Sequence, residues 1–240
     1  MIAIKAYILH SPLEKDRIQK VDAIKKQFAN IEVVPSIYPS QTRIPFLKDL
    51  IQKSKERTGV TLRASEVACL LGHRKIWHQI VSLDIEDKEH VLVMESDSKI
   101  MYPAMLEKSY AKYTEHYDLF FWGAWEGNLK IKRSSIVFNE YGFKVGTPLI
   151  NTAYCMYGYS LNKKAAMYLL KQTKLISYPV DFFKKFVQEG AIRIGAIKEE
   201  VIGTWLEGSY IRNINFLYSV KRGLLLLVLN IRNSLKAYFS

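Results

Sequence analysis

The chain has 240 residues, of which 49% are hydrophobic and 24% are charged, so it is long enough for one large globular domain with a buried core. Its formal net charge of +12 favours acidic partners such as nucleotide phosphates, nucleic acid or an anionic membrane, although a solvated basic surface also accounts for it. The two cysteines, Cys69 and Cys155, do not form a C-x-x-C pattern, which argues against a disulfide framework and for reduced thiols.

The first part of the chain predicts the opening of a parallel sheet. Residues 2–9 are expected as a strand, residues 14–28 as an amphipathic helix and residues 31–34 as a second strand, which together make a β-α-β unit. A short helix over residues 46–55 precedes a longer helix over about residues 66–83, for which Ser65 is the expected N-cap.

Two carboxylates follow the third predicted strand. Residues 91–94 are all apolar, and the chain then runs directly into Glu95 and Asp97. Because ligands of an open α/β sheet bind beyond the carboxyl ends of its strands, these two acids are suitably placed to hold a divalent cation against a phosphate. On the residues alone, the alternative is a strand end that simply meets solvent.

The second half of the sequence predicts a further alternation of helices and strands, followed by a segment of different composition. We expect helices over residues 102–113 and 162–172, strands over residues 117–122, 152–160 and 192–197, a hairpin or loop over residues 128–143, and a helix start within residues 179–188. Residues 211–240 contain five basic residues and no acid among many Leu, Phe, Val and Tyr. The expected domains are therefore a catalytic domain over residues 1–208 and a basic amphipathic helical tail over residues 209–240, which lies on a membrane surface or packs on the domain.

Several blocks in this order resemble glycosyltransferase family 25, the lipooligosaccharide-type transferases of Gram-negative bacteria. The blocks run from Tyr7 to Arg17, from Glu66 to Trp77 (similar to GEIGCALSHxxxW), from Val91 to Asp97 (similar to IxLEDD), from Ala153 to Ser160 with Ala165 after it, and from Pro179 to Asp181. The resemblance covers roughly residues 1–210. It implies an α/β fold of GT-A-like type, a single Rossmann-type domain with a mainly parallel central sheet.

The resemblance also implies a reaction. A hexose, galactose or glucose being favoured, passes from a UDP-sugar to a lipooligosaccharide, LPS or capsule acceptor, with inversion and with the help of a metal. A lipid-linked acceptor places the expected enzyme in the cytoplasm, peripherally on the inner face of the bacterial inner membrane.

One departure from the family pattern concerns the metal. Ser96 stands where the pattern has a second acid, whereas Asp97 keeps the last position. Asp97 is therefore the first choice as ligand of Mn²⁺ or Mg²⁺, with Glu95 as the second ligand or as a donor contact. Ser96 either weakens metal binding at this site or leaves the binding of the sugar donor mainly to basic residues. Since every histidine precedes residue 117, no histidine ligand is expected from late in the chain.

The acceptor hydroxyl needs a general base, for which a carboxylate is the usual choice. Asp181 is nominated because it follows Pro179 in a predicted loop, although the same position suits a helix N-cap. Glu126 is its rival. Trp122, close by in the sequence, is expected to stack on a sugar ring or to belong to the core.

The remaining candidates are contacts to the donor. His10 and Ser11 end the first strand, and Arg17 starts the first helix, where each could reach the base or ribose of a nucleotide. The longer helix contributes a second set: Glu66, His73 and Arg74. Glu66 and His73 are seven residues apart and share a helix face, and His73 is either a diphosphate contact or a core residue.

Two other classes of protein compete with a transferase. One is a basic protein that binds membrane or nucleic acid without catalysis, and the other is a degenerate transferase in which Ser96 marks lost activity. No helix-turn-helix, zinc-finger or RNP-like motif supports nucleic acid as a partner. A bare binding module would also not require carboxylates at a strand end.

Overall fold

The computed structural model of the protein describes residues 1–124, 127–205 and 228–240. Within them, the main sheet has eight strands in the order β2-β1-β3-β8-β5-β9-β7-β6, and a second sheet pairs β10 with β4. The bounds of these strands are β1 Ile2–His10, β2 Phe28–Pro35, β3 Val91–Glu95, β4 Ser98–Ile100, β5 Leu119–Phe121, β6 Val137–Phe138, β7 Lys144–Gly146, β8 Gly158–Leu161, β9 Ile194–Ile197 and β10 Ile202–Thr204.

The main sheet is mixed, with a mostly parallel core. β1 runs parallel to β2 and β3, and β5 runs parallel to β9. β8 lies between β3 and β5 and runs antiparallel to both. As a result, β1, β3, β5 and β9 end at the same edge of the sheet at which β8 begins. The expected α/β fold with a mainly parallel sheet is confirmed.

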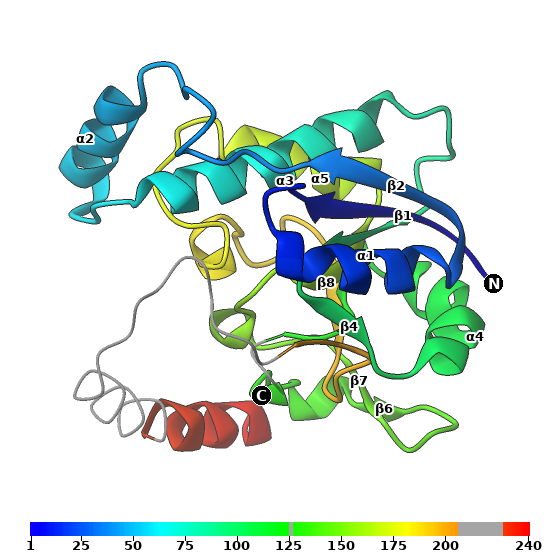
Figure 1. Ribbon diagram of the computed structural model, residues 1–240. Helices are drawn as coiled ribbons and strands as arrows, with labels where there is room; N and C mark the ends of the chain where they lie inside the picture. Colours follow the sequence, from blue (N-terminus) through cyan, green and yellow to red (C-terminus); the bar gives the residue numbers. More distant parts are fainter. Residues whose placement is uncertain (125–126, 206–227) are drawn as a thin grey trace.

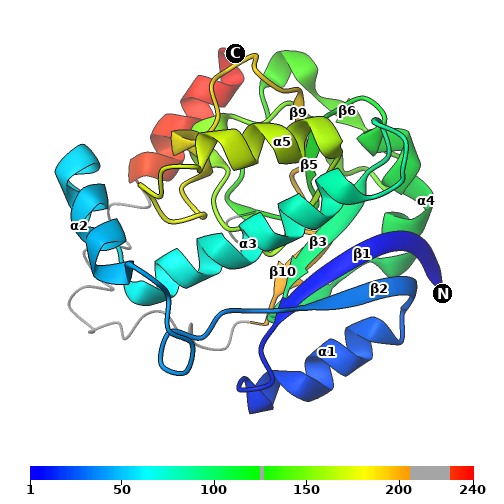
Figure 2. The same ribbon diagram turned by 90° about the horizontal axis from the view of Figure 1, so that it is seen from above.

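Helices cover both faces of the sheet, and α2 lies outside this layered body (Figures 1 and 2). Their bounds are α1 Ile18–Lys25, α2 Leu47–Thr58, α3 Ala64–Ser82, α4 Pro103–Thr114 and α5 Lys163–Gln172. The strands alternate their side chains between two cores. Tyr7 and Leu9 of β1 pack into the core under α3 and α5, whereas Ala6 and Ile8 pack into the core under α1 and α4.

α3 begins earlier than its sequence predicts. Glu66 accepts a hydrogen bond from the backbone N–H of Arg63 at 2.8 Å, so the helix is capped at residue 63 and Ser65 lies in its first turn. The expectation that Ser65 is the N-cap is therefore wrong. Further along, a Cβ at Gly72 would come within 2.9 Å of Leu9, and the glycine lets α3 lie close against β1.

Two other differences come from contacts that are distant in sequence. The predicted helix over residues 14–28 is a 3-10 turn, Lys15–Arg17, followed by α1, because Phe28 already pairs alongside Ile2 as the first residue of β2. The small β4–β10 sheet was not expected. It joins Ile100 to Ile202, a pairing that no local pattern reveals.

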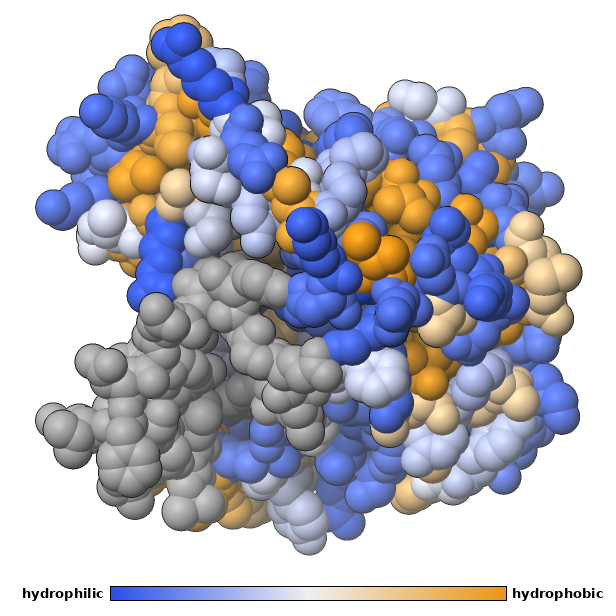
Figure 3. Space-filling model, viewed as in Figure 1, coloured by the Kyte–Doolittle hydropathy of each residue, from blue (hydrophilic) through white to orange (hydrophobic). Residues whose placement is uncertain are grey.

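The C-terminal residues 228–238 form a helix that packs on the domain. Asn233 is buried and accepts a hydrogen bond from Asn151 at 2.9 Å, and Ala237 is buried beside it. The remainder of the predicted tail, residues 209–227, lies outside the described residues. In the part of the chain that is described, no helix is long and apolar enough to cross a membrane. Hydrophilic residues cover most of the described surface in Figure 3, with apolar residues in small separate groups.

Candidate active site

The predicted carboxylates lie at the edge of the sheet where the parallel strands end. Glu95 is the last residue of β3, and Asp97 follows in the turn to β4. The backbone N–H of Trp205, just after β10, donates to the backbone oxygen of Asp97 at 2.9 Å. The end of β1 contributes His10 and Ser11 at this edge, so segments from both halves of the chain meet there.

Ser96 sits in a buried polar network with the β1–α1 turn. Its hydroxyl donates to Glu14 Oε2 at 2.8 Å and accepts from Arg17 Nη1 at 2.8 Å. Glu14 Oε2 also lies 3.2 Å from His10 Nδ1 and accepts from the backbone N–H of Ser11 at 3.3 Å. Ser96 occupies a position at which the family pattern has an acid, and it is hydrogen-bonded to the carboxylate of Glu14 from another segment.

Arg17 connects this network to Asp97. Its Nη2 lies 3.1 Å from Asp97 Oδ2 and its Nη1 lies 3.7 Å from Glu14 Oε1. The structure thus brings together three predicted donor contacts, His10, Ser11 and Arg17, around Glu14. Sequence reasoning missed Glu14 as a site residue. Its spacing of four residues from His10 and three from Arg17 was the available signal.

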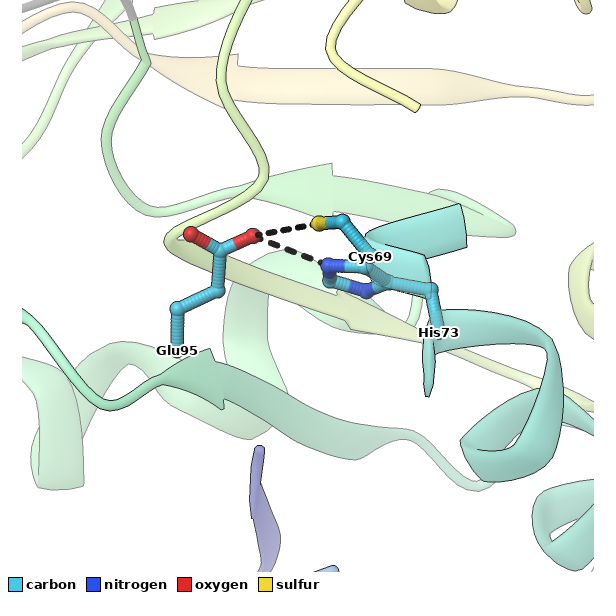
Figure 4. A group of neighbouring side chains, drawn as sticks. All are labelled: Cys69, His73 and Glu95. Carbon is cyan, nitrogen blue, oxygen red and sulfur yellow. Dashed lines mark hydrogen bonds and ion pairs between the residues drawn. The ribbon is translucent and has the colours of Figure 1, made fainter. Parts of the chain in front are cut away.

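A second network fixes Glu95 from the side of α3. His73 Nε2 lies 2.9 Å from Glu95 Oε1 (Figure 4). On its other side, His73 Nδ1 lies 2.9 Å from the hydroxyl of Tyr159. The same hydroxyl accepts from Trp77 Nε1 at 2.9 Å. Because an indole nitrogen can only donate, the Tyr159 hydroxyl proton is left to point at His73 Nδ1. Neutral His73 therefore carries its proton on Nε2 and donates it to Glu95.

Burial and mutual repulsion shape the electrostatics of this edge. Burial, followed by the charge of Glu95, raises the pKa of Asp97 to about 6, and the nearby Arg17 guanidinium limits the rise. Burial also raises the pKa of the Cys69 thiol well above its usual range, with further contributions from Glu95, Asp181 and Asp97. These influences place Asp181 on the same side of the sheet as the carboxylates.

Asp181 lies in the turn before η5, a 3-10 helix over Phe183–Lys185. The N-cap position of η5 is Phe182, so Asp181 lies one residue before the position that the sequence suggested for it as a helix N-cap. Glu126, its rival as a base, lies outside the described residues.

The side chains present fit a hard divalent cation. Asp97 Oδ1 is buried and has no hydrogen-bond partner among the residues that the structure describes, whereas Oδ2 faces Arg17. The charge of Glu95 acts on Asp97. Among the described residues, Oε1 of Glu95 interacts with His73, so its Oε2 is available to another ligand. Two carboxylate oxygens of this kind are the ligands that Mn²⁺ and Mg²⁺ take.

Three other predicted substrate contacts have structural interactions of their own. The Arg74 guanidinium donates to Leu170 O at 2.8 Å and to Thr173 Oγ1 at 2.6 Å, which ties α3 to the end of α5. Glu66 caps the start of α3. Trp122 is fully buried, donates to Ser160 Oγ at 3.0 Å and stacks on Tyr110, so of the two roles expected for it the structure shows the core one.

A family comparison agrees with this geometry. The sequence profile described as "Glycosyltransferase family 25 (LPS biosynthesis protein)" matches residues 11–184. The match contains the β1–α1 turn, α3, the end of β3 and Asp181, and so nearly every segment that builds the candidate site. No curated protein matches the chain.

Proposed function

Because the chain belongs to glycosyltransferase family 25, we propose that the carboxylates at the end of β3 form the donor site of a transferase that uses a UDP-hexose. The family establishes the coarser statement: the protein is a glycosyltransferase of the LPS biosynthesis type, which takes a sugar from a donor to an oligosaccharide acceptor. The choice of galactose or glucose as the sugar, and of lipooligosaccharide, LPS or capsule as the acceptor, is part of the proposal.

The observation that carries the proposal is the buried Asp97 Oδ1, which has no partner among the described residues although its own carboxylate is ion-paired through Oδ2. A buried unpaired carboxylate oxygen is costly unless a ligand completes it. Mn²⁺ or Mg²⁺ held by Asp97 Oδ1 and Glu95 would offset the negative charge that grows on the leaving diphosphate.

The residues around Asp97 have supporting roles. Arg17 keeps one oxygen of Asp97 turned toward α1, which directs the other toward the proposed cation. His73 holds Glu95 through Oε1. Glu14 and Ser96 in turn hold Arg17 in place, so the loss of an acid at position 96 does not remove negative charge from this corner of the site.

The acceptor hydroxyl must lose its proton during an inverting transfer, and we assign this step to Asp181. The position of Asp181 supports this assignment, because its charge acts on the thiol of Cys69, next to Glu95. Glu126 remains the second choice on sequence grounds alone.

We further propose that the C-terminal helix rests on an anionic membrane, where a lipid-linked acceptor would be found. The support is its outward face, on which five apolar side chains are more than half exposed: Val228, Ile231, Leu235, Tyr238 and Phe239. Most of these positions are three or four residues apart and so share one side of the helix. Arg232 and Lys236 are exposed beside them. Basic and apolar side chains together favour an anionic lipid surface.

The decisive experiment is calorimetric titration of the protein with UDP, with and without Mn²⁺. We expect binding that needs the metal and that Asp97→Asn abolishes, while Asp49→Asn on the exposed side of α2 leaves it unchanged. UDP release from UDP-galactose and UDP-glucose, each with an LPS acceptor, then identifies the donor. Absence of UDP binding under all conditions would reject the UDP-sugar site and direct the search for the donor to other nucleotide sugars.

A further inference from the structure

A thiol, an imidazole and a carboxylate meet behind the proposed donor site. Cys69 and His73 project from successive turns of α3 toward Glu95 at the end of β3 (Figure 4). We propose that these three side chains form a second cation site, specific for a thiophilic divalent ion such as Zn²⁺ and distinct from the Mn²⁺ or Mg²⁺ position at Asp97.

The spacing suits one small ion. Sγ of Cys69 lies 3.9 Å from Glu95 Oε1, His73 Nε2 lies 2.9 Å from the same oxygen, and the three ligand atoms all fall within 4.8 Å of one another. Tetrahedral zinc with sulfur, nitrogen and oxygen ligands needs separations of about 3.3–3.6 Å between them. An ion would require the Nε2–Oε1 separation to lengthen and the Sγ–Oε1 separation to shorten, each by about 0.3–0.5 Å, and the Sγ–Nε2 separation, which is at most 4.8 Å, to come into the same range.

The type of ligand separates this site from the other one. Sulfur and imidazole nitrogen prefer zinc and neighbouring transition metals, whereas Mn²⁺ and Mg²⁺ prefer carboxylate oxygens such as those of Asp97. Four positions complete zinc coordination, and the three side chains leave the fourth to water or to a ligand.

The surroundings also suit a bound ion. His73 is fully buried, and Glu95, Asp97 and Asp181 all act electrostatically on Cys69, so negative charge is concentrated around a buried position. On binding, the thiol proton leaves to solvent and the imidazole proton moves from Nε2 to Nδ1. The Tyr159 hydroxyl then rotates its own proton away from Nδ1, so that its oxygen, 2.9 Å from Nδ1, accepts the bond from the imidazole, which is the usual outer contact of a metal-bound histidine.

Sharing Glu95 has a consequence for activity, and this part rests on the proposed function. An ion bound to Glu95 Oε1 fixes that carboxylate and adds positive charge next to the Mn²⁺ or Mg²⁺ position. We therefore expect Zn²⁺ to inhibit transfer, and to do so through Cys69.

The test of binding uses Co²⁺ as a spectroscopic substitute for Zn²⁺ on the full chain. A thiolate bound to Co²⁺ gives a charge-transfer absorption band, which Zn²⁺ then removes by competition. We expect this band in the wild type and in Cys155→Ser, the matched control with the other cysteine replaced, but not in Cys69→Ala. Zn²⁺ affinity of Cys69→Ala should fall about tenfold or more.

Equal Zn²⁺ affinity in the wild type and Cys69→Ala, or a band that disappears with Cys155→Ser instead, would overturn the site. Thermal unfolding of each variant without metal separates loss of the site from loss of the fold. Because Co²⁺ binding requires neither donor nor acceptor, it is independent of whether UDP-sugar transfer is the reaction. In the activity arm, Zn²⁺ should inhibit the wild type and Cys155→Ser more strongly than Cys69→Ala.

Discussion

Asp97, the proposed cation ligand, is ionised in the folded protein only at a cost to stability. Its pKa is raised to about 6 in the folded chain by burial and by the charge of Glu95, whereas an unfolded chain has the ordinary value near 3.8. A raised pKa of an acid means that the fold disfavours the ionised form. The folded protein without metal therefore loses stability as pH rises from about 4 to about 6.

Asp97→Asn should accordingly stabilise the metal-free protein at pH 7.5 while abolishing metal-dependent UDP binding. The expected gain is about 1–2 kcal/mol, which is smaller than the shift alone suggests because the amide that replaces the carboxylate needs a hydrogen-bond partner of its own in the buried site. Urea unfolding in the presence of a chelator measures it. At pH 3, where Asp97 is largely protonated in both states, most of this gain should disappear, and an equal gain at both pH values would contradict the argument.

Tyr159 provides a second test at the scale of one hydroxyl group. Tyr159→Phe leaves the buried Trp77 N–H and His73 Nδ1 without their partner. We expect a loss of about 1–3 kcal/mol in the free energy of unfolding, measured by urea denaturation. Tyr141→Phe, which removes a hydroxyl from an exposed side chain, should change it little. Equal effects of the two substitutions would show that the hydrogen-bond chain behind Glu95 is unimportant for stability.

The site residues that could be predicted from sequence are those for which the neighbouring residues in the chain contain the signal. Glu95 and Asp97 follow an apolar strand directly, and strand ends of this kind face ligands. The bond between Glu14 and Ser96 joins residues 82 positions apart, so no local pattern reveals it. For Trp122 the sequence left sugar stacking and the core both open for a related reason, since only the packing of α4 shows that its ring lies in the core.

At the scale of secondary structure elements, local periodicity was informative where an element packs along its whole length. α3 and β3 have continuous apolar faces and were predicted within two residues. The helix predicted over residues 14–28 was too long because β2 pairs with β1 from Phe28 onward. The strand predicted over residues 152–160 begins only at Gly158, and its antiparallel direction is set by the loop before it.

Asp118 holds several elements together at the opposite edge of the sheet. It precedes β5, is buried, and accepts bonds from Lys164 of α5 at 2.9 Å and from Arg193 before β9 at 3.1 Å. Burial opposes its ionisation, but bonds from Arg193, Lys164 and Asn162 outweigh burial and hold its pKa well below the ordinary value. Its ionised form therefore stabilises the fold.

Asp118→Asn should destabilise the protein by roughly 2 kcal/mol at pH 7, since one buried charge is lost but its two cationic partners are about half exposed. The sign of the pH dependence is opposite to that of Asp97. A depressed pKa gives stability that is present above about pH 4 and is lost as pH falls further. Urea denaturation of the wild type and of Asp118→Asn at pH 7 and pH 3 should show a smaller difference in the free energy of unfolding at pH 3. A difference that is the same at both pH values would rule out the charge of Asp118 as its source.

At the scale of the whole molecule, the C-terminal helix is oriented with its small and polar side chains inward. Asn233 and Ala237 face the domain, whereas Ile231 and Leu235 are each 57% exposed. A helix that only served to complete the core would have the reverse arrangement. Together with the net charge of +12, this orientation favours a peripheral contact with anionic lipid.

Sedimentation with vesicles of mixed neutral and anionic lipid tests this contact. Replacing both Ile231 and Leu235 by Ser should weaken binding about tenfold or more, because each apolar side chain that enters the interface contributes on the order of 1 kcal/mol or more. The control replaces Val137 and Phe138 of β6 by Ser, since these residues are just as exposed but lie on another part of the surface. Raising the salt concentration should weaken binding of the wild type as well. If both double variants bind like the wild type, the exposed face of the helix is not the membrane contact, and binding that survives high salt would contradict the electrostatic part of the proposal.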